Sequence, residues 1–405
     1  MTPAALAAFL LFAAPARAQV DPDRRRLVQF GYDQNFSGPG PTGAYAFYYM
    51  NEPEFPSKGM SLRVALAPVY VDSELAVKSA LGENTDVGLG LAGGGFADSY
   101  AEVHQGHYAR DESFVGHGGK ASLSLYHLFD PGAMIPLNGV LRGIISGSSY
   151  SKTSDTAAGF SLPPDGMTYI TRAGLRLGGE PPQLMPRRSA ELSVWYEGRW
   201  REHPSVYGFD GDRSVNPRAD LVWSRALFAY RPESGRRFRV SMEAGTSRNA
   251  DRLDTYRLGG FLPFASEFPL SIPGFYNGEI SARRYVLMTG LIEQPLDEQK
   301  RWSADLFGSA ADTTYLQGLG QQGPWNEGAG VGLVYDSPNA VWKVASGYAY
   351  GISAIRAGGR GAHSAMLLVQ LDLEAWKKKQ VPSVRRRYAP IKPEGLDWLF
   401  QMFKP

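Results

Sequence analysis

Glycine spacing offers the first candidate for chemistry in this 405-residue sequence. Residues 88–93 read Gly-Leu-Gly-Leu-Ala-Gly, which satisfies the dinucleotide-binding pattern G-x-G-x-x-G. That pattern needs a following helix whose N-terminus meets the pyrophosphate. Here Gly94, Gly95 and Phe96 continue a glycine-rich strand instead. The glycines therefore indicate close packing of strands, and we expect no cofactor.

Histidines are the second candidate, because they ligate metals and act as general bases. His104, His107 and His117 lie close together in the sequence, but no spacing holds them on one helical face with a carboxylate. A protease or lipase would need a Ser/His or Asp/His set, and His127 with Asp130 is the closest such pair in the sequence. Serine and aspartate are too common for this pair to indicate catalysis. We expect loop histidines, no metal, no catalytic residues and no enzyme activity.

Charged side chains within strand-like segments are the third candidate. In residues 237–244, Phe, Val, Met and Ala alternate with Arg, Arg, Ser and Glu, so that one face is apolar and the other polar. A barrel wall needs this division. The candidate lumen charges are Arg237, Arg239, Glu243, Arg283 and Arg284. They would line a passage or form a polar network around a loop that plugs the lumen, and we favour the plug.

The elements that position these residues are strands, because period-two alternation recurs along most of the chain. Two predicted outward sets are Ala190, Leu192, Val194 and Tyr196, and Leu367, Val369, Leu371 and Leu373. Further strands are predicted to start near Leu62, Val87, Ala121, Val140, Ile170, Leu221, Ile280, Ala304, Val331 and Val341.

Roughly sixteen such segments fall between residues 43 and 374, and single-chain bacterial barrels have even strand numbers. Their spacing leaves the ~10 residues that a tilted, membrane-spanning strand requires. The predicted fold is therefore all-β, a transmembrane antiparallel β-barrel of about 16 strands. A secreted soluble sandwich or propeller is the alternative, since alternation also arises from ordinary packing.

Composition supports the barrel. The 21 Tyr, 20 Phe and 8 Trp suit a wall whose aromatic rings gather where hydrocarbon meets headgroups. The absence of cysteine excludes disulfides, thiolate metal sites and a lipid-modified cysteine. A net charge of +2 gives no argument for a nucleic-acid partner. Beyond the N-terminal region no segment has 18 consecutive apolar residues, so any membrane crossing must use strands.

The two ends of the sequence differ from its middle. An apolar run at residues 4–14 precedes Ala16-Arg-Ala18, a small-x-small pattern that predicts a signal peptide over residues 1–18. Residues 19–42 contain a basic run and a Gly/Pro-rich stretch, which we interpret as a short periplasmic lead-in to a barrel spanning residues 43–375. Residues 376–405 form a basic tail that we also expect to be periplasmic.

Motif order in the last third carries a family resemblance. Residues 328–338 form a glycine-rich strand that runs into Asp336-x-Pro338. Upstream lie the pair Gly259-Gly260 and then Pro273-Gly274-Phe275. From about residue 256 the chain resembles the barrel of the bacterial surface-antigen superfamily, which includes BamA, TamA and the patatin-like outer-membrane proteins. The resemblance implies that Pro273-Gly274-Phe275 lies in an inward-folded loop. The resemblance covers the barrel only, without polypeptide-transport-associated (POTRA) domains.

Two departures from the family concern this loop. The family carries Arg-Gly-Phe/Tyr in the loop, whereas Pro273 occupies the position of the arginine here. The aspartate expected to pair with that arginine is replaced by Ser309. Losing both partners together is consistent, because a buried charge without its partner is costly. If the loop is locked in place, we expect a different lock.

The predicted role is that of a surface-antigen-type barrel in the outer membrane of a Gram-negative bacterium, assisting protein or lipid insertion or translocation. A porin-like diffusion channel and a structural or adhesive surface protein are the alternatives. The expected partners are outer-membrane lipids and, during biogenesis, the barrel-assembly machinery. The sequence does not identify a cargo.

Overall fold

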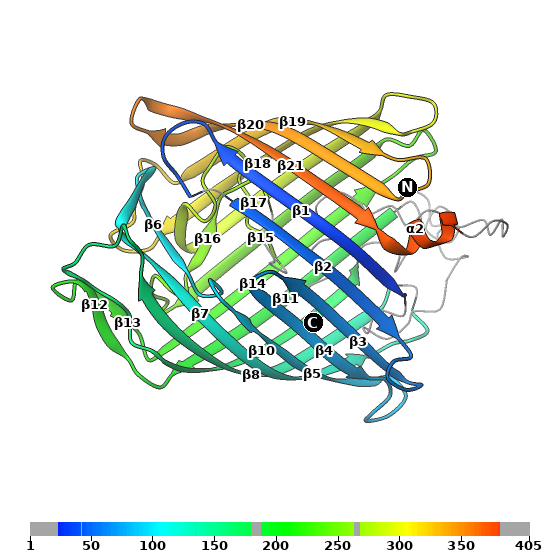
Figure 1. Ribbon diagram of the computed structural model, residues 1–405, viewed down its shortest axis with the longest axis horizontal. Coiled ribbons are helices and arrows are strands. Elements are labelled where there is room, and N and C mark those ends of the chain that lie inside the picture. The colour runs from blue at the N-terminus through cyan, green and yellow to red at the C-terminus, as the bar shows by residue number, and fades with distance from the viewer. Residues whose placement is uncertain (1–22, 42, 134, 180–187, 263–267, 381–405) are drawn as a thin grey trace, which may run out of the picture.

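The structure is a computed structural model that describes residues 23–41, 43–133, 135–179, 188–262 and 268–380 (Figure 1). Sixteen long strands form its wall. They are β1 (Arg25–Asn35), β2 (Gly43–Pro53), β3 (Met60–Ala67), β4 (Tyr70–Val77), β5 (Thr85–Gly94), β7 (His107–Leu128), β8 (Leu137–Lys152), β10 (Gly166–Gly179), β11 (Arg188–Arg201), β14 (Arg218–Tyr230), β15 (Arg237–Arg248), β17 (Ile280–Pro295), β18 (Trp302–Tyr315), β19 (Trp325–Asp336), β20 (Trp342–Arg356) and β21 (Gly359–Asp372).

Every wall strand pairs antiparallel with the next wall strand along the chain, and β1 pairs with β21. The β1–β21 seam runs without interruption from Leu27 opposite Asp372 to Asn35 opposite Ser364. The sheet is therefore closed, and the prediction of a 16-stranded antiparallel barrel is confirmed.

Short elements decorate the two ends of the barrel. At the loop end lie β6 (Tyr100–His104), β16 (Tyr256–Leu258) and a small sheet of β9 (Phe160–Ser161), β12 (Ser205–Phe209) and β13 (Arg213–Val215). At the opposite, terminal end β21 leads into α2 (Leu373–Gln380), as Figure 1 shows. Within the described ranges, no helix combines the length and the apolar character needed to cross a membrane.

The two faces of the wall differ as the alternation predicts. In β11, Leu192 and Val194 are exposed on the outside, whereas Ser193 and Trp195 are buried on the inside. In β15, Phe238, Val240 and Met242 are likewise exposed. Soluble proteins rarely expose an apolar surface that continues from strand to strand. The wall therefore suits hydrocarbon outside and a polar interior, and not the core of a soluble sandwich.

The predicted lead-in at residues 19–42 is wrong over β1. Val28, Phe30 and Tyr32 face outward, and the polar side chains of Gln29 and Asp33 are buried inside. This alternation was obscured by the neighbouring arginine run and the Gly/Pro-rich stretch. Because β1 closes the seam, the wall begins at Arg25 instead of residue 43.

The remaining boundaries are only partly described. The predicted signal peptide and residues 381–405 of the predicted tail lie outside the described residues. The first part of that tail forms α2, which packs against the start of β1, where Glu374 lies 3.6 Å from the Nε atom of Arg26. The periplasmic position of both ends stays a prediction.

Candidate functional site in the barrel lumen

The connection between β16 and β17, residues 259–279, folds into the lumen; we call it the plug loop. It is described over residues 259–262 and 268–279. Ile272, Phe275 and Tyr276 are almost fully buried. Its contacts reach β1, β19 and β20, so the loop crosses the lumen from its own strands to the wall beside the seam.

The tip of the plug loop rests directly on wall backbone. Gly274 has a φ of +85°, and a Cβ atom there would lie 1.9 Å from the amide nitrogen of Gly351 in β20. A Cβ atom at Gly328 in β19 would lie 2.0 Å from the carbonyl oxygen of Pro273. Asn35 donates from Nδ2 to the carbonyl oxygen of Gly274 at 2.7 Å. Glycine at these three positions thus allows backbone to meet backbone.

A buried ion pair locks the base of the plug loop. Arg356, the last residue of β20, donates from Nη1 and Nη2 to the two carboxylate oxygens of Glu279 at 2.8 and 3.0 Å. The guanidinium also lies 3.8 Å from the centre of the Tyr276 ring, and the Tyr276 amide donates to Glu279. Such two-pronged contacts fix geometry as well as contributing energy. The acid is therefore on the loop and the arginine on the wall.

A second anchor comes from β1. The Asp33 carboxylate accepts hydrogen bonds from the backbone amides of Phe261 at 2.8 Å and Leu262 at 3.4 Å. The neck of the loop at this point is shaped by Gly259 and Gly260, which have φ values of +126° and +81°. Gly260 forms an isolated bridge with Ile272, so the two arms of the loop are joined.

The structure thus gathers five of the family-like positions in the plug loop, namely Gly259, Gly260, Pro273, Gly274 and Phe275. Asp336 and Pro338 lie elsewhere, at the turn between β19 and β20 on the terminal end. The Asp336 amide donates to the carbonyl of Arg301 in the neighbouring connection. These two residues shape a turn, and no contact joins them to the described residues of the plug loop.

The candidate lumen charges divide into two groups. Arg237 and Glu243 are buried on the inner face and Arg239 is half-buried there, with Glu293 3.9 Å from Arg237. Arg283 and Arg284 are exposed. A β-bulge between Ala282 and Arg284 shifts the alternation, so that Arg284 shares the outer face with Val286. The lumen assignment of this pair is therefore wrong, because period-two counting cannot detect a bulge.

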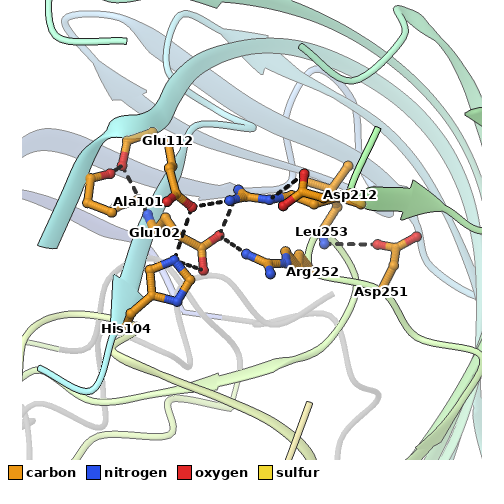
Figure 2. A network of polar contacts seen from close by, with 12 residues as sticks. Ala101, Glu102, His104, Glu112, Asp212, Asp251, Arg252 and Leu253 are labelled. Atoms are coloured by element: carbon orange, nitrogen blue, oxygen red, sulfur yellow. Dashed lines mark hydrogen bonds and ion pairs between the residues drawn. The ribbon is translucent and has the colours of Figure 1, made fainter. Parts of the chain in front are cut away.

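A network of charged residues joins the loops above the wall (Figure 2). His104 Nε2 lies 3.0 Å from a carboxylate oxygen of Glu112, and Arg252 lies 2.6 Å from Glu102. Arg213, in β13, contacts both glutamates. The arrangement brings Glu102, His104 and Glu112 close enough to surround a cation. Two guanidinium groups already neutralise these acids, so the geometry favours an ion-pair clamp between loops.

The prediction of loop histidines is wrong, because His104 lies in β6 and His107 and His117 lie in β7. His104 lies in β6 beside two carboxylates, whereas a loop position without a carboxylate partner was expected. Spacing along one chain could not reveal this, because Arg213 and Arg252 come from distant segments. His127 contacts the hydroxyl of Thr85 through Nδ1 at 2.9 Å.

The residues that hold the plug loop were not predicted from the sequence. Asp33 was placed in the lead-in, and neither Glu279 nor Arg356 was singled out. Glu279 had a signal, since it lies four residues after the family-like Pro273-Gly274-Phe275 motif and directly precedes an apolar strand position at Ile280. Arg356 had none, because its partner is 77 positions away in the sequence.

Comparison with known proteins agrees with this architecture. The sequence matches no family model and no curated protein. Among solved structures, CdiB from Acinetobacter baumannii matches with a TM-score of 0.58, 12% identity and coverage of 89% of this chain. BamA from Haemophilus ducreyi lacking POTRA domains 1–3 matches with a TM-score of 0.54, 11% identity and 86% coverage of this chain.

The fold is that of the CdiB and BamA barrels. CdiB from Escherichia coli matches at a TM-score of 0.54, 12% identity and 87% coverage. This chain spans 64% of the length of each CdiB chain and 71% of the BamA chain. The resemblance noted in the sequence therefore extends to the three-dimensional fold. The activities of those larger proteins are not transferred by fold alone.

Proposed function

We propose that this protein is an outer-membrane barrel that its plug loop closes at rest, and that it assists the insertion or translocation of protein or lipid. The observation that carries the proposal is the lock between Glu279 and Arg356, which holds the loop across the lumen. Breaking one partner of a buried ion pair costs about 3–5 kcal/mol, so the lock favours a closed resting state.

The closed seam is the second support. The uninterrupted β1–β21 ladder closes the wall around the plug loop. The inner face of the wall carries paired charges, such as Arg172 with Glu197 at 2.6 Å. A steady diffusion channel needs an unobstructed, solvated passage. The fold shared with the BamA and CdiB barrels also supports placing the protein among outer-membrane barrels.

The location and partners belong to the same proposal. The apolar outer belt supports contact with outer-membrane lipids, because closed barrels with such a belt occur in the outer membranes of Gram-negative bacteria. Assembly there would depend on the barrel-assembly machinery. We also propose that the protein is not an enzyme, since the plug loop and its lock explain the buried charges around them without a reaction.

Planar-bilayer recording of the full chain tests the closed state. We expect almost no steady conductance from the wild-type protein and frequent openings from Arg356→Met, which leaves Glu279 buried without its partner. Arg284→Gln is the matched control, because Arg284 is an exposed arginine on the outer face of β17. Large, steady wild-type conductance would support the porin-like alternative and overturn the proposal.

Vesicle assays test the assisting role. Vesicles that contain the protein should accelerate insertion of a second, radiolabelled β-barrel or transfer of a labelled phospholipid between leaflets, relative to protein-free vesicles. If neither process is accelerated and the loops bind cells or matrix instead, the adhesive alternative is favoured.

A further inference from the structure

One sector of the wall is lower than the rest. β3 and β4 have 8 residues each, whereas the other wall strands have 10 to 22. Their connection is a tight turn, with Ala67 directly opposite Tyr70. Leu66 lies opposite Tyr48, and Tyr48 lies opposite Val28, yet β1 continues beyond Val28 to Asn35. The shortfall is therefore at the loop end, where it forms a notch in the rim (Figure 1).

The notch reaches below the membrane surface. A strand of 8 residues that rises about 3.3 Å per residue and tilts by about 45° spans roughly 19 Å. The apolar band of an outer-membrane barrel is about 25 Å tall. Residues 43–47 of β2 stand above the last pair with β3, so no residue of β3 pairs with this edge of β2, which faces the notch.

A large cavity lies behind the notch. Its volume is about 980 Å³, at the upper end of the range for small-molecule sites. Ala67, Val69 and Phe96 line it at the rim of the notch, and Val69 and Phe96 are exposed. Phe268 and Leu270 of the plug loop line it from inside the lumen. The cavity thus offers apolar surfaces from the membrane side to the centre of the barrel.

Basic side chains dominate the charge of this cavity. Its lining holds five basic residues, Lys120, Arg142, Arg172, Arg199 and Arg257, against three acids, Asp72, Glu197 and Asp254.

The five basic residues differ in their pairing. Arg142 and Arg172 have glutamate partners at 2.8 and 2.6 Å. Lys120 faces inward from β7, opposite Ala92 of β5, and forms no ion pair with any residue in the described part of the chain. Lys120 is thus positioned beside the notch to receive an anionic group.

From these features we infer that the cavity binds an amphiphile with one acyl chain and an anionic head group, which enters sideways from the membrane over the β3–β4 hairpin. The acyl chain lies among the apolar residues, and the head group contacts the Lys120 ammonium. The inference goes beyond the proposed resting plug, because it assigns a ligand and a route of entry from the membrane that the conductance state does not specify.

Binding of tritiated palmitate, lysophosphatidate and monopalmitoylglycerol to the full chain in nanodiscs tests the head-group chemistry. We expect both anions, or one of them, to bind more tightly than the uncharged glycerol ester. Binding of palmitate alone assigns a carboxylate ligand, and binding of lysophosphatidate alone assigns a phosphate ligand. Equal binding of all three amphiphiles, or no binding, overturns the inference.

Two matched pairs of variants test the position of the site. Lys120→Gln should weaken anion binding by about tenfold, the effect of losing one charge-assisted contact, whereas Lys78→Gln at the terminal end should not. Ala67→Trp fills the notch from its inner side and should abolish most binding. Leu66→Trp, on the lipid-facing side of the same hairpin, should leave binding unchanged.

Each variant must first be shown to fold, and a shift in gel migration on heating shows that its barrel has formed. Unchanged anion binding in Lys120→Gln, or equal effects of the two tryptophans, would contradict the site. These results are separate from conductance: an open wild-type channel would refute the resting plug and leave the binding data unaffected.

Discussion

At the scale of single residues, the contact between Gly274 and Gly351 determines whether the plug loop can seat. Gly274→Ala should displace the tip, because its Cβ atom would overlap the β20 backbone. Gly323→Ala is the control, since Gly323 has nearly the same positive φ, +82°, but open space around its Cβ position. Both variants carry the strain of about 1–2 kcal/mol of a left-handed residue. We expect increased channel opening in planar bilayers only for Gly274→Ala; equal behaviour of the two variants would contradict direct seating.

The loop clamp above the wall should respond to acid. Burial alone would raise the pKa of Glu112, but hydrogen bonds from His104 and Arg213 outweigh it and hold the pKa below its usual value. A carboxylate with a lowered pKa stabilises the fold above its ordinary pKa, and this contribution is lost as the pH falls through the lowered value. The protection factors of amide hydrogen exchange in the β6–β7 hairpin, which correct for the slower intrinsic exchange in acid, should therefore fall as the pH drops below about 4.5. Glu112→Gln should remove that pH dependence, and wild-type protection factors that stay constant with pH would exclude the clamp.

The contacts between individual residues were the hardest feature to predict from the sequence. The sequence pointed to an inward loop through Gly259, Gly274 and Phe275, and the structure places all three in the plug loop. The lock residues could not be paired, because Glu279 and Arg356 meet only after the barrel has closed around the loop. Spacing along the chain carries no information about such a contact.

At the scale of elements, the alternation of side chains across each strand was readable because the period is two. Val194→Arg should destabilise the barrel folded in vesicles by about 2–4 kcal/mol, since Val194 lies on the outer face of β11. Val206→Arg is the control, because Val206 is exposed in the small sheet at the loop end. A loss at both positions, or at neither, would contradict the proposed lipid-facing side of the wall.

Element boundaries were harder to predict where local signals compete. In β1, basic and Gly/Pro-rich neighbours obscured a strand whose outer face is as apolar as the others. In β17, one bulge moved Arg283 and Arg284 out of the predicted lumen. Both errors have the same physical cause: pairing with a neighbouring strand decides the register, and the neighbour is not visible in a local pattern.

At the scale of the whole molecule, closure through β1 and β21 should make the barrel resistant to detergent. The unheated protein should migrate faster than the heated protein in dodecyl sulfate gels. Deletion of residues 25–35 should abolish this difference, because β2 and β21 would each keep an unpaired edge. A deletion of residues 205–215, which removes β12 and β13 outside the wall, should preserve it. Heat-modifiable migration of the β1 deletion would show that the seam is dispensable.

The seam also dictates the order of events during biogenesis. β1 and β21 are the first and last strands of the wall in chain order, so the ladder that joins them cannot form until every wall strand has been synthesised. Contacts between distant segments form late and slowly, because the loop between them must lose its freedom first. We therefore expect the unpaired strand edges to need protection from other chains until the seam has closed.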